Sequence, residues 1–331
     1  MKFKDVIGID VGKLSNELRI HSNQKTLTFK NTPKNCKTML KWIKVNINCN
    51  QTEVLFAFEH TGIYSTPLIE FLANNNLHFT LLSGLDIKRS LGIQRGKNDK
   101  IDAKRIALYS YRKLDEIKPY VLPSNNLIKL KRLLSLREKI VVQKAGYDKV
   151  IQESKIFFKK ADNIVLFDVQ EKIYKQLKKH IEKIEHEIDE IILQDQKIKE
   201  QYTLITSIKG VGRQTALYMI AYTNCFTLFD NWRKFASYAG TAPFPYQSGI
   251  SINGRTKVSH LANKKFKSLL NMCATTSIKC NPEMKEYFER KKTEGKNGMC
   301  VINAVRNKIL ARIFAVIKRG TPYVDLNKFA A

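Results

Sequence analysis

The first third of the chain opens with short apolar runs separated by polar residues. The run DVIGIDVGK at 5–13 is apolar and bounded by glycines, while ELRIHS at 17–22 and TLTFKN at 26–31 alternate apolar and polar positions. A continuous apolar run is typical of a buried strand, and alternation is typical of a half-exposed one. These patterns predict three strands in an antiparallel meander.

Helices and strands are then predicted to alternate: helices over 36–47 and 60–76, strands over 53–59 and 78–83, and a helix from about Asp99. The run EVLFAFE at 53–59 is almost wholly apolar, which predicts a central strand buried on both faces. In the helix over 60–76, Leu68, Phe71 and Leu72 should face inward. The order of three strands, helix, strand, helix, strand and helix resembles the ribonuclease-H fold.

Between residues 126 and 202, leucine and isoleucine recur every three or four residues among charged side chains. The positions are Leu127, Leu130, Leu133, Leu134, Ile173, Leu177, Ile181, Ile184, Ile188 and Ile191. This spacing predicts two long helices with a break near KKADNIVLFD at 159–168. The helices would pair as an antiparallel coiled coil and offer a dimerisation surface. A plain helical linker accounts for the pattern equally well.

The last part of the chain is predicted to be mainly helical. LITSIKGVGRQTALYMIAY at 204–222 has the pattern of a helix, a tight turn and a helix, and a glycine-rich loop is expected over 236–260. The clearest amphipathic helix is expected over 301–320. The predicted fold class is therefore α/β plus α: a ribonuclease-H-like mixed sheet with helices, a helical coiled coil, and a mainly helical C-terminal domain. The expected boundaries are 1–122, 123–202 and 203–331.

The chain is strongly basic. Lys and Arg number 58 against 30 Asp and Glu, which gives a net charge of +28 over 331 residues. The surplus is uneven, because residues 1–125 carry +9, residues 126–202 carry +4 and residues 203–331 carry +15. A surplus of this size predicts a polyanionic partner, and nucleic acid is the common one. We therefore expect much of the phosphate contact in the C-terminal part.

The cysteines and the hydropathy pattern indicate where the protein works. The six cysteines are scattered, without a CxxC pair or zinc-type Cys/His spacing, which favours a reducing compartment. The opening MKFKDVIGID reaches acidic residues too early for a secretory signal, and no run of about 18 apolar residues predicts a membrane span. We expect a cytoplasmic, nucleoid-associated protein without a membrane partner.

Two carboxylates stand at unusual places in the predicted strands. Asp10 lies inside the apolar IGIDVGK, and Glu59 ends the apolar LFAFE. A carboxylate in a buried strand needs a partner, and in a ribonuclease-H sheet these two strands would be neighbours. Asp10 could instead accept backbone hydrogen bonds at a strand end, and Glu59 could cap the following helix.

Two further carboxylates lie in the basic stretch RGKNDKIDAKRIALY at 95–109. Asp99 and Asp102 are three residues apart and share one face of a predicted helix start. Asp99 as the N-cap and Asp102 near the third helical position could simply stabilise the helix N-terminus. With Asp10 and Glu59, however, they form a set of four acids suited to Mg²⁺, or to Mn²⁺ in its place. Two such ions about 4 Å apart can clamp a phosphodiester. The flanking bases would then contact phosphate: Arg95, Lys97, Lys100, Lys104 and Arg105.

Two C-terminal motifs also suggest contact with DNA. SIKGVGRQTA at 207–216 resembles a helix-hairpin-helix, in which glycines let the backbone approach a phosphate, although a tight turn between helices gives the same pattern. Its expected contacts are Lys209, Gly210, Gly212 and Arg213. In the glycine-rich loop, Ser248 is a candidate nucleophile for a DNA phosphate, with Arg255 and Lys257 placing that phosphate. From the residues alone, a turn-forming hydroxyl is the stronger interpretation of Ser248.

Five motifs occur in a fixed order: IGIDVGK, AFEHTGIYS, KNDKIDAKRIA, IKGVGRQTA and FASYAGTAPFPYQSGIS. From about residue 5 to residue 322 they resemble the DEDD transposases of bacterial insertion sequences, the bridge-RNA-guided serine recombinases, and the related site-specific DNA invertases. Each motif alone is weak, but their joint occurrence is specific. One departure is Asn98, which stands just before Asp99 where the family often has threonine. Asn98 is not one of the four acids.

The resemblance implies a RuvC-like N-terminal domain with Asp10, Glu59, Asp99 and Asp102 as its metal-binding tetrad, joined by a coiled coil to a C-terminal transposase domain. Ser248 matches the family's nucleophile, and Ser251 is the fallback because the spacing from the preceding Ala-Pro varies. Family members form tetramers whose site combines the two domains of different subunits, so a homo-oligomer from dimer to tetramer is expected. A structured non-coding bridge RNA would pair with donor and target DNA.

The expected function is that of an RNA-guided transposase and DNA recombinase of an insertion sequence. It would cut and rejoin DNA through a 5′-phosphoserine intermediate, with Mg²⁺ at the acidic cluster. The first alternative is a RuvC-like Holliday-junction nuclease that uses metal-activated water, with Ser248 structural. The second is a non-catalytic nucleic-acid-binding protein, against which the complete set of acids argues.

Overall fold

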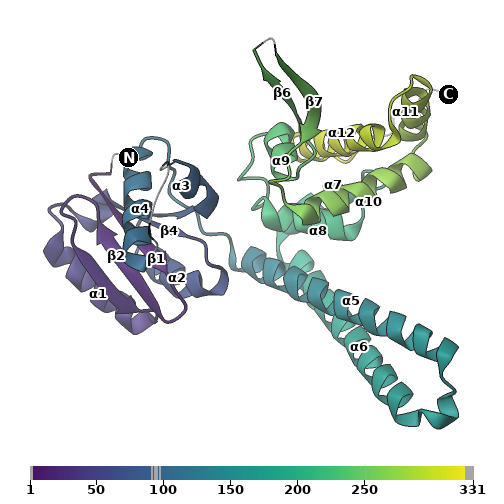
Figure 1. The fold of residues 1–331 in the computed structure, drawn as a ribbon, viewed down its shortest axis with the longest axis horizontal. Coiled ribbons are helices and arrows are strands. Elements are labelled where there is room, and N and C mark those ends of the chain that lie inside the picture. The colour runs from purple at the N-terminus through teal and green to yellow at the C-terminus, as the bar shows by residue number, and fades with distance from the viewer. Residues whose placement is uncertain (1–2, 91, 93–95, 97, 250, 325–331) are drawn as a thin grey trace. The chain divides into compact units, whose positions relative to one another are not determined.

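The structure is a computed structural model that describes residues 3–90, 92, 96, 98–249 and 251–324. The chain divides into two compact units, Met1–Leu122 and Pro123–Ala331 (Figure 1). The first unit combines a mixed sheet with helices and the second is mainly helical, which confirms the predicted mixed α/β fold. The three-part division stays a prediction.

The first unit is built on a five-stranded sheet in the order β3-β2-β1-β4-β5. β1, β2 and β3 pair antiparallel, whereas β4 runs parallel to both β1 and β5. β1 and β4 are central and almost wholly buried, as their apolar runs predict. The strands are β1 (Asp5–Val11), β2 (Ser15–Ile20), β3 (Thr26–Lys30), β4 (Val54–Glu59) and β5 (Phe79–Leu82).

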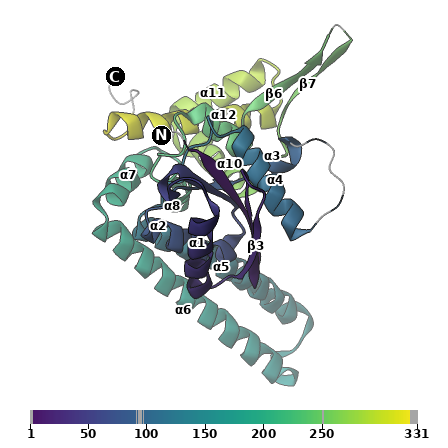
Figure 2. The same cartoon turned by 90° about the vertical axis from the view of Figure 1, so that its left-hand side faces the viewer.

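Helices cover both faces of this sheet (Figure 2). They are α1 (Pro33–Asn46), α2 (Thr66–Asn74), α3 (Gly84–Ser90) and α4 (Asp99–Arg112). α1 and α2 pack on one face, against Ile7 and Ile9 of β1. α3 and α4 cover the other face, against Val6 of β1 and Ala57 of β4. Alternate residues of β1 therefore serve two separate cores, as the two-residue period of a strand requires.

The close approach of α4 to β1 depends on Gly8. A Cβ atom placed on Gly8 would lie 2.4 Å from the backbone oxygen of Ala103 and 2.4 Å from the backbone nitrogen of Ala107. Backbone atoms cannot yield at such distances as the end of a flexible side chain can, so only glycine lets the helix rest directly on the strand. This contact fixes where α4 lies along β1.

The second unit is mainly helical. Its elements are α5 (Asn125–Phe157), α6 (Ile164–Gln194), α7 (Gln196–Thr206), α8 (Arg213–Tyr222), α9 (Trp232–Tyr238), β6 (Pro243–Ser248), β7 (Ile252–Val258), α10 (Lys264–Cys280), α11 (Pro282–Thr293) and α12 (Gly298–Arg319). α5 and α6 pack together as a long helical hairpin (Figure 1), with the break where the sequence predicts it. Leu130 and Ile188 join the core of this unit, and heptad coiled-coil packing stays a prediction.

The core of the second unit holds α8, α10 and α12 together. α8 is buried over most of its length, and the ring of Phe235 in α9 meets that of Phe266 in α10 edge-on, with 5.0 Å between centroids. Such edge-to-face pairs add to the free energy gained from burying the rings. None of the helices in the described part of the chain is long and apolar enough to cross a membrane.

Several elements differ from the sequence prediction. Pro243–Ser248 and Ile252–Val258, predicted as part of a glycine-rich loop, pair as the antiparallel hairpin β6–β7. Every residue of β6 is exposed, so β6 lacks the apolar alternation that identifies a strand. The helix predicted from residue 60 begins at Thr66, with Pro67 in its first turn and a 3₁₀ turn before it. α3 and α9 have seven residues each, too few for a periodic pattern to reveal.

We expect Gly8→Ala to destabilise the first unit by about 1–3 kcal/mol, because α4 must move off β1 to make room for the methyl group. Thermal unfolding of the full chain, followed by circular dichroism, should show that the Gly8→Ala variant loses structure at a lower temperature than the wild type. Gly146→Ala is the control. Gly146 lies inside α5 with open space around it, so the same replacement should stabilise by up to about 1 kcal/mol. Equal stability of the Gly8→Ala variant and the wild type would contradict the packing argument.

Candidate functional site

Asp10 and Glu59 lie on one face of the sheet and at one edge of it. Gly8 and Ala57 are register partners in β1 and β4, and Asp10 and Glu59 stand two residues further along these parallel strands. Because alternate side chains of a strand share a face, both acids lie on the face that α4 covers. The Glu59 carboxylate also lies against Gly84 at the start of α3, where a Cβ would be 2.6 Å from Oε2.

α4 runs against β1, so that its acidic first turn lies toward the same edge. Near the C-terminal end of α4, Tyr111 stacks on His21 with 3.8 Å between ring centroids. The backbone N–H of His21 donates to the start of β1. The middle of the helix rests on Gly8. The first turn, which carries Asp99 and Asp102, therefore lies toward the carboxyl end of β1.

The two acids in the first turn of α4 differ in hydrogen bonding and in exposure. The N-cap is Asn98, whose side chain accepts a hydrogen bond from the Ile101 amide at 2.8 Å. The capping role that the sequence allows for Asp99 is therefore wrong, and Asp99 is exposed at the first helical position. Asp102 is half-buried and accepts a hydrogen bond from Arg105 at 2.9 Å.

The acids fit a hard divalent cation by donor type. Asp10 and Glu59 on one face of the sheet, with Asp99 and Asp102 in the first turn of α4, offer the oxygen ligands that Mg²⁺ and Mn²⁺ prefer. Within the described ranges, however, no three Asp, Glu, His or Cys side chains converge closely enough to hold a metal ion. Binding of a cation would therefore require these side chains to reorient.

The bases around the acidic turn differ in their roles. Lys100 and Lys104 are exposed on α4, where they are available to a phosphate. Arg105 donates to the Gly96 carbonyl at 3.0 Å as well as to Asp102, so in this arrangement it orders the acidic turn. The predicted phosphate contacts of Arg95 and Lys97 lie outside the described residues.

Ser248 ends β6 on the exposed hairpin of the second unit. It is the register partner of Ile252 in β7, and its side chain is exposed. Gly249 follows it with φ +53°, a left-handed conformation that favours glycine and turns the chain. Across the strands, the Gln247 side chain donates to that of Asn253 at 3.0 Å. The hairpin therefore presents the serine hydroxyl to solvent, beyond the helices of its unit (Figure 1).

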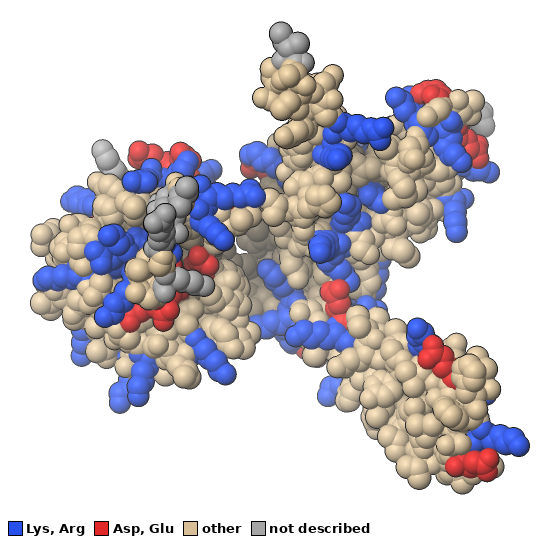
Figure 3. Space-filling model, in the orientation of Figure 1, with Lys and Arg blue, Asp and Glu red and all other residues tan. Residues whose placement is uncertain are grey.

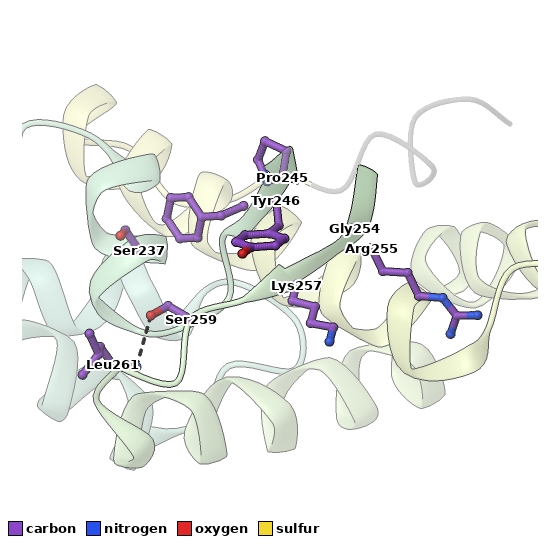
Figure 4. Close-up of a pocket in the computed structure, with 9 residues that line it drawn as sticks. Ser237, Pro245, Tyr246, Gly254, Arg255, Lys257, Ser259 and Leu261 are labelled. Carbon is purple, nitrogen blue, oxygen red and sulfur yellow. Dashed lines mark hydrogen bonds between the residues drawn. The ribbon is translucent and has the colours of Figure 1, made fainter. Parts of the chain in front are cut away.

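An open cavity of about 620 Å³ lies beside the hairpin. Aromatic side chains of β6 line it, among them Tyr246, together with Arg255 and Lys257 of β7 (Figure 4). Both bases are exposed and line the same cavity. Aromatic surface beside exposed cations suits a nucleic-acid strand, because bases stack on the rings and phosphates meet the cations.

A polar network that the sequence analysis missed anchors the segment before the hairpin. Asn303 and Asn307 of α12 both donate to the Thr241 carbonyl, at 2.9 and 3.0 Å. Arg306, which is 5% exposed, bonds to Asn303 and to Asn271 of α10. Burial lowers the pKa of Arg306. The spacing N-x-x-R-N inside an amphipathic helix is the signal that could have revealed this network, because such polar residues rarely face a core without partners.

The Gly-Val-Gly turn is packed differently at its two glycines. Gly210 has φ +89°, and a Cβ there would lie 2.8 Å from the Ser277 backbone of α10. Gly212 is the N-cap of α8 and has open space around it. Gly210 is therefore explained by helix packing, whereas Gly212 leaves the N-terminus of α8 accessible.

Arg213 is bound within the protein. It donates to Asp189 of α6 at 2.5 Å and to the Glu185 carbonyl at 3.3 Å. Burial acts to lower the pKa of Arg213, but the hydrogen bond and charge of Asp189 outweigh it, so that this pKa is raised. Contacts of Lys209, Gly210, Gly212 and Arg213 with DNA stay predictions.

Comparison with known families gives two matches. Residues 7–151 match a DEDD transposase family of IS110 type, described as transposase, and residues 202–289 match the transposase IS116/IS110/IS902 family. The chain belongs to the IS110-type DEDD transposases. The first match includes the four candidate metal ligands Asp10, Glu59, Asp99 and Asp102. The second includes the Gly-Val-Gly turn and the β6–β7 hairpin.

Individual relatives agree with this assignment. The transposase is 28% identical over 330 residues to the pilin gene-inverting protein of Moraxella bovis. The alignment covers 97% of this chain and 98% of that protein. The pilin gene-inverting protein of Moraxella lacunata is equally similar. A 43.6 kDa protein of insertion element IS110 from Streptomyces coelicolor is 28% identical over 120 residues, 36% of this chain and 29% of that protein. The transposase is thus an enzyme that cuts and rejoins DNA.

We expect Arg255→Gln and Arg213→Gln to affect DNA binding by the transposase differently. Loss of the exposed Arg255 should weaken binding and reduce the slope of log affinity against log salt by about one phosphate contact. Loss of Arg213 should leave that slope unchanged and lower stability by roughly 0.5–1 kcal/mol, because Asp189 loses its partner. Affinity titrations at several salt concentrations measure both slopes. Equal slopes for Arg255→Gln and wild type would contradict a phosphate contact at Arg255.

Proposed function

We propose that the transposase is an RNA-guided recombinase that moves its own insertion sequence through a covalent serine intermediate. In this proposal the first unit is a RuvC-like metal-dependent domain, the α5–α6 hairpin is a coiled coil, and the rest of the second unit is the serine domain. The observation that carries the proposal is that Asp10 and Glu59 lie on one face and at one edge of the sheet, toward which the acidic turn of α4 points.

Asp10, Glu59, Asp99 and Asp102 would hold Mg²⁺, or Mn²⁺. When bound, the cation supplies Lewis-acid stabilisation of the charge that develops on the phosphate and the leaving oxygen. The exposed Lys100 and Lys104 beside these acids would hold the neighbouring phosphates of the strand. Because phosphates repel the acids in the absence of a cation, DNA cleavage should require the metal.

Ser248 would attack the scissile phosphate. Its Oγ forms a bond to phosphorus, the bond from phosphorus to the 3′ oxygen breaks, and the serine proton is released. The 3′ oxygen takes up a proton and becomes a free 3′-hydroxyl, while the 5′ phosphate stays on the serine. The bond energy stored in this ester allows rejoining without an external energy source. Arg255 and Lys257, further along the neighbouring strand β7, would hold phosphates of the same DNA strand.

A structured non-coding RNA would select the donor and target DNA by base pairing, while the protein reads backbone and shape. The charge distribution supports binding of nucleic acid, since residues 203–331 carry +15 of the total +28. Lys and Arg are spread over the visible faces of each unit (Figure 3), as sequence-independent backbone contact requires.

The transposase would act as a homo-oligomer, from dimer to tetramer. Large apolar side chains are exposed at the end of the α5–α6 hairpin: Ile156 is 75% exposed, Phe157 is 77% exposed and Val165 is 75% exposed. Clustered exposed apolar residues of this kind mark protein interfaces. A second copy of the chain would cover them, and subunit association would bring several metal and serine sites to one DNA junction.

The alternatives make different products. A RuvC-like junction nuclease would use water as the nucleophile and would release nicked DNA whether or not Ser248 is present. A protein that only binds nucleic acid would release no product at all. The pilin gene-inverting relatives favour recombination over simple cleavage, because an inversion requires that broken strands be rejoined.

We expect a protein–DNA adduct that survives denaturation when the transposase is mixed with labelled DNA from the ends of its element, a candidate RNA from the flanking non-coding segment, and Mg²⁺. The adduct should disappear in Ser248→Ala and in Asp10→Asn, because one removes the nucleophile and the other a metal ligand. Ser251→Ala is the matched control and should keep the adduct. Denaturing gel electrophoresis measures the amount of adduct that each variant forms.

Nicked DNA without an adduct, persisting in Ser248→Ala, would establish the water-using nuclease instead. An adduct that is lost in Ser251→Ala and kept in Ser248→Ala would move the nucleophile to Ser251. An adduct formed equally well without RNA would contradict RNA guidance and leave the serine chemistry standing.

A further inference from the structure

A fifth carboxylate lies beside Asp10 in the sheet. Glu17 of β2 is the register partner of Asp10 in the antiparallel β1–β2 pair. Directly opposed residues of antiparallel strands have their side chains on the same face, with Cβ atoms about 4.5–5.5 Å apart. Glu17 therefore lies on the face that α4 covers, together with Asp10 and Glu59. α4 also packs against β2 itself.

The side chain of Glu17 is buried and only partly satisfied. It is 8% exposed. Its Oε1 accepts a hydrogen bond from the Thr28 hydroxyl of β3, whereas its Oε2 is buried without a hydrogen-bond partner in the part of the chain described here. A buried carboxylate oxygen without a partner is costly.

A divalent cation at Asp10 accounts for this arrangement. The cation would neutralise both acids and would give Oε2 the partner that it lacks. We propose that Glu17 belongs to the divalent-cation site of the transposase, contributing Oε2 to Mg²⁺ or Mn²⁺ as a ligand or through a bound water. Thr28 holds the carboxylate through Oε1, which leaves Oε2 to reach the cation. This inference rests on the proposed metal site and extends it from four acids to five.

The test measures Mn²⁺ binding to the purified full-length transposase without DNA, from the free-ion signal in electron paramagnetic resonance. Four proteins are compared: wild type, Glu17→Gln, Asp10→Asn and Glu70→Gln. Glu70 is an exposed glutamate of α2, on the opposite face of the sheet, so its variant carries the same charge change away from the site. We expect Glu17→Gln to weaken Mn²⁺ binding by about tenfold or more, Asp10→Asn to weaken it at least as much, and Glu70→Gln to bind as the wild type does.

Thermal melting without metal separates this role from a structural one. Gln can still accept from Thr28, and it removes the repulsion with Asp10, so Glu17→Gln should melt no lower than wild type without metal and should gain less on addition of Mg²⁺. If Glu17→Gln does not fold, Glu17→Asp, which keeps the charge and shortens the reach, should also weaken binding.

The outcomes distinguish this inference from the proposed metal site. Wild-type affinity in Glu17→Gln or Glu17→Asp, with binding lost in Asp10→Asn, would overturn the role of Glu17 and leave the four-acid site standing. Equal affinity in wild type and Asp10→Asn would overturn the metal site itself, and the role of Glu17 with it. Binding weakened in both Glu17→Gln and Asp10→Asn, but not in Glu70→Gln, supports the five-acid site.

Discussion

The direct contact of α4 with β1 at Gly8 determines where the first unit holds the acids of α4 relative to Asp10 and Glu59. Because the backbone of Ala103 and Ala107 lies where a Cβ would be, the helix cannot slide along the strand without losing this contact. Its N-terminal turn is thereby held toward the edge at which Asp10 and Glu59 end their strands. Acids that are 89 and 92 residues from Asp10 in the sequence, Asp99 and Asp102, thus reach one end of the sheet through backbone packing, before any metal binds.

The second unit presents its candidate nucleophile in the opposite manner. Ser248 lies on an exposed hairpin with little core of its own, so the orientation of the hairpin depends on its attachment. The hydrogen bonds from Asn303 and Asn307 to the Thr241 carbonyl hold the segment just before β6 against α12. A buried polar network of this kind can specify one arrangement where apolar packing would allow several. The transposase thereby combines an exposed serine with a hairpin whose preceding segment is hydrogen-bonded to α12.

Much of this arrangement could be predicted from the sequence, and the exceptions share a physical cause. The unbroken apolar runs of β1 and β4 predict central strands, and Asp10 and Glu59 stand out because acids rarely occur there. The role of Gly8 could not be predicted, since it depends on a helix about 95 residues away. The pairing of Glu17 with Asp10 requires the register of two strands. The exposed strands of the β6–β7 hairpin lack alternation, and the packing of Gly210 on Ser277 depends on tertiary contact.

The most direct test of the central claim is the position of the cation. Crystals of the full-length transposase soaked with Mn²⁺ should give an anomalous diffraction peak at the carboxyl ends of β1 and β4, within coordinating distance of Asp10 and Glu59 and of at least one acid on α4. A well-occupied Mn²⁺ peak elsewhere on the protein, with none at this edge of the sheet, would contradict the account.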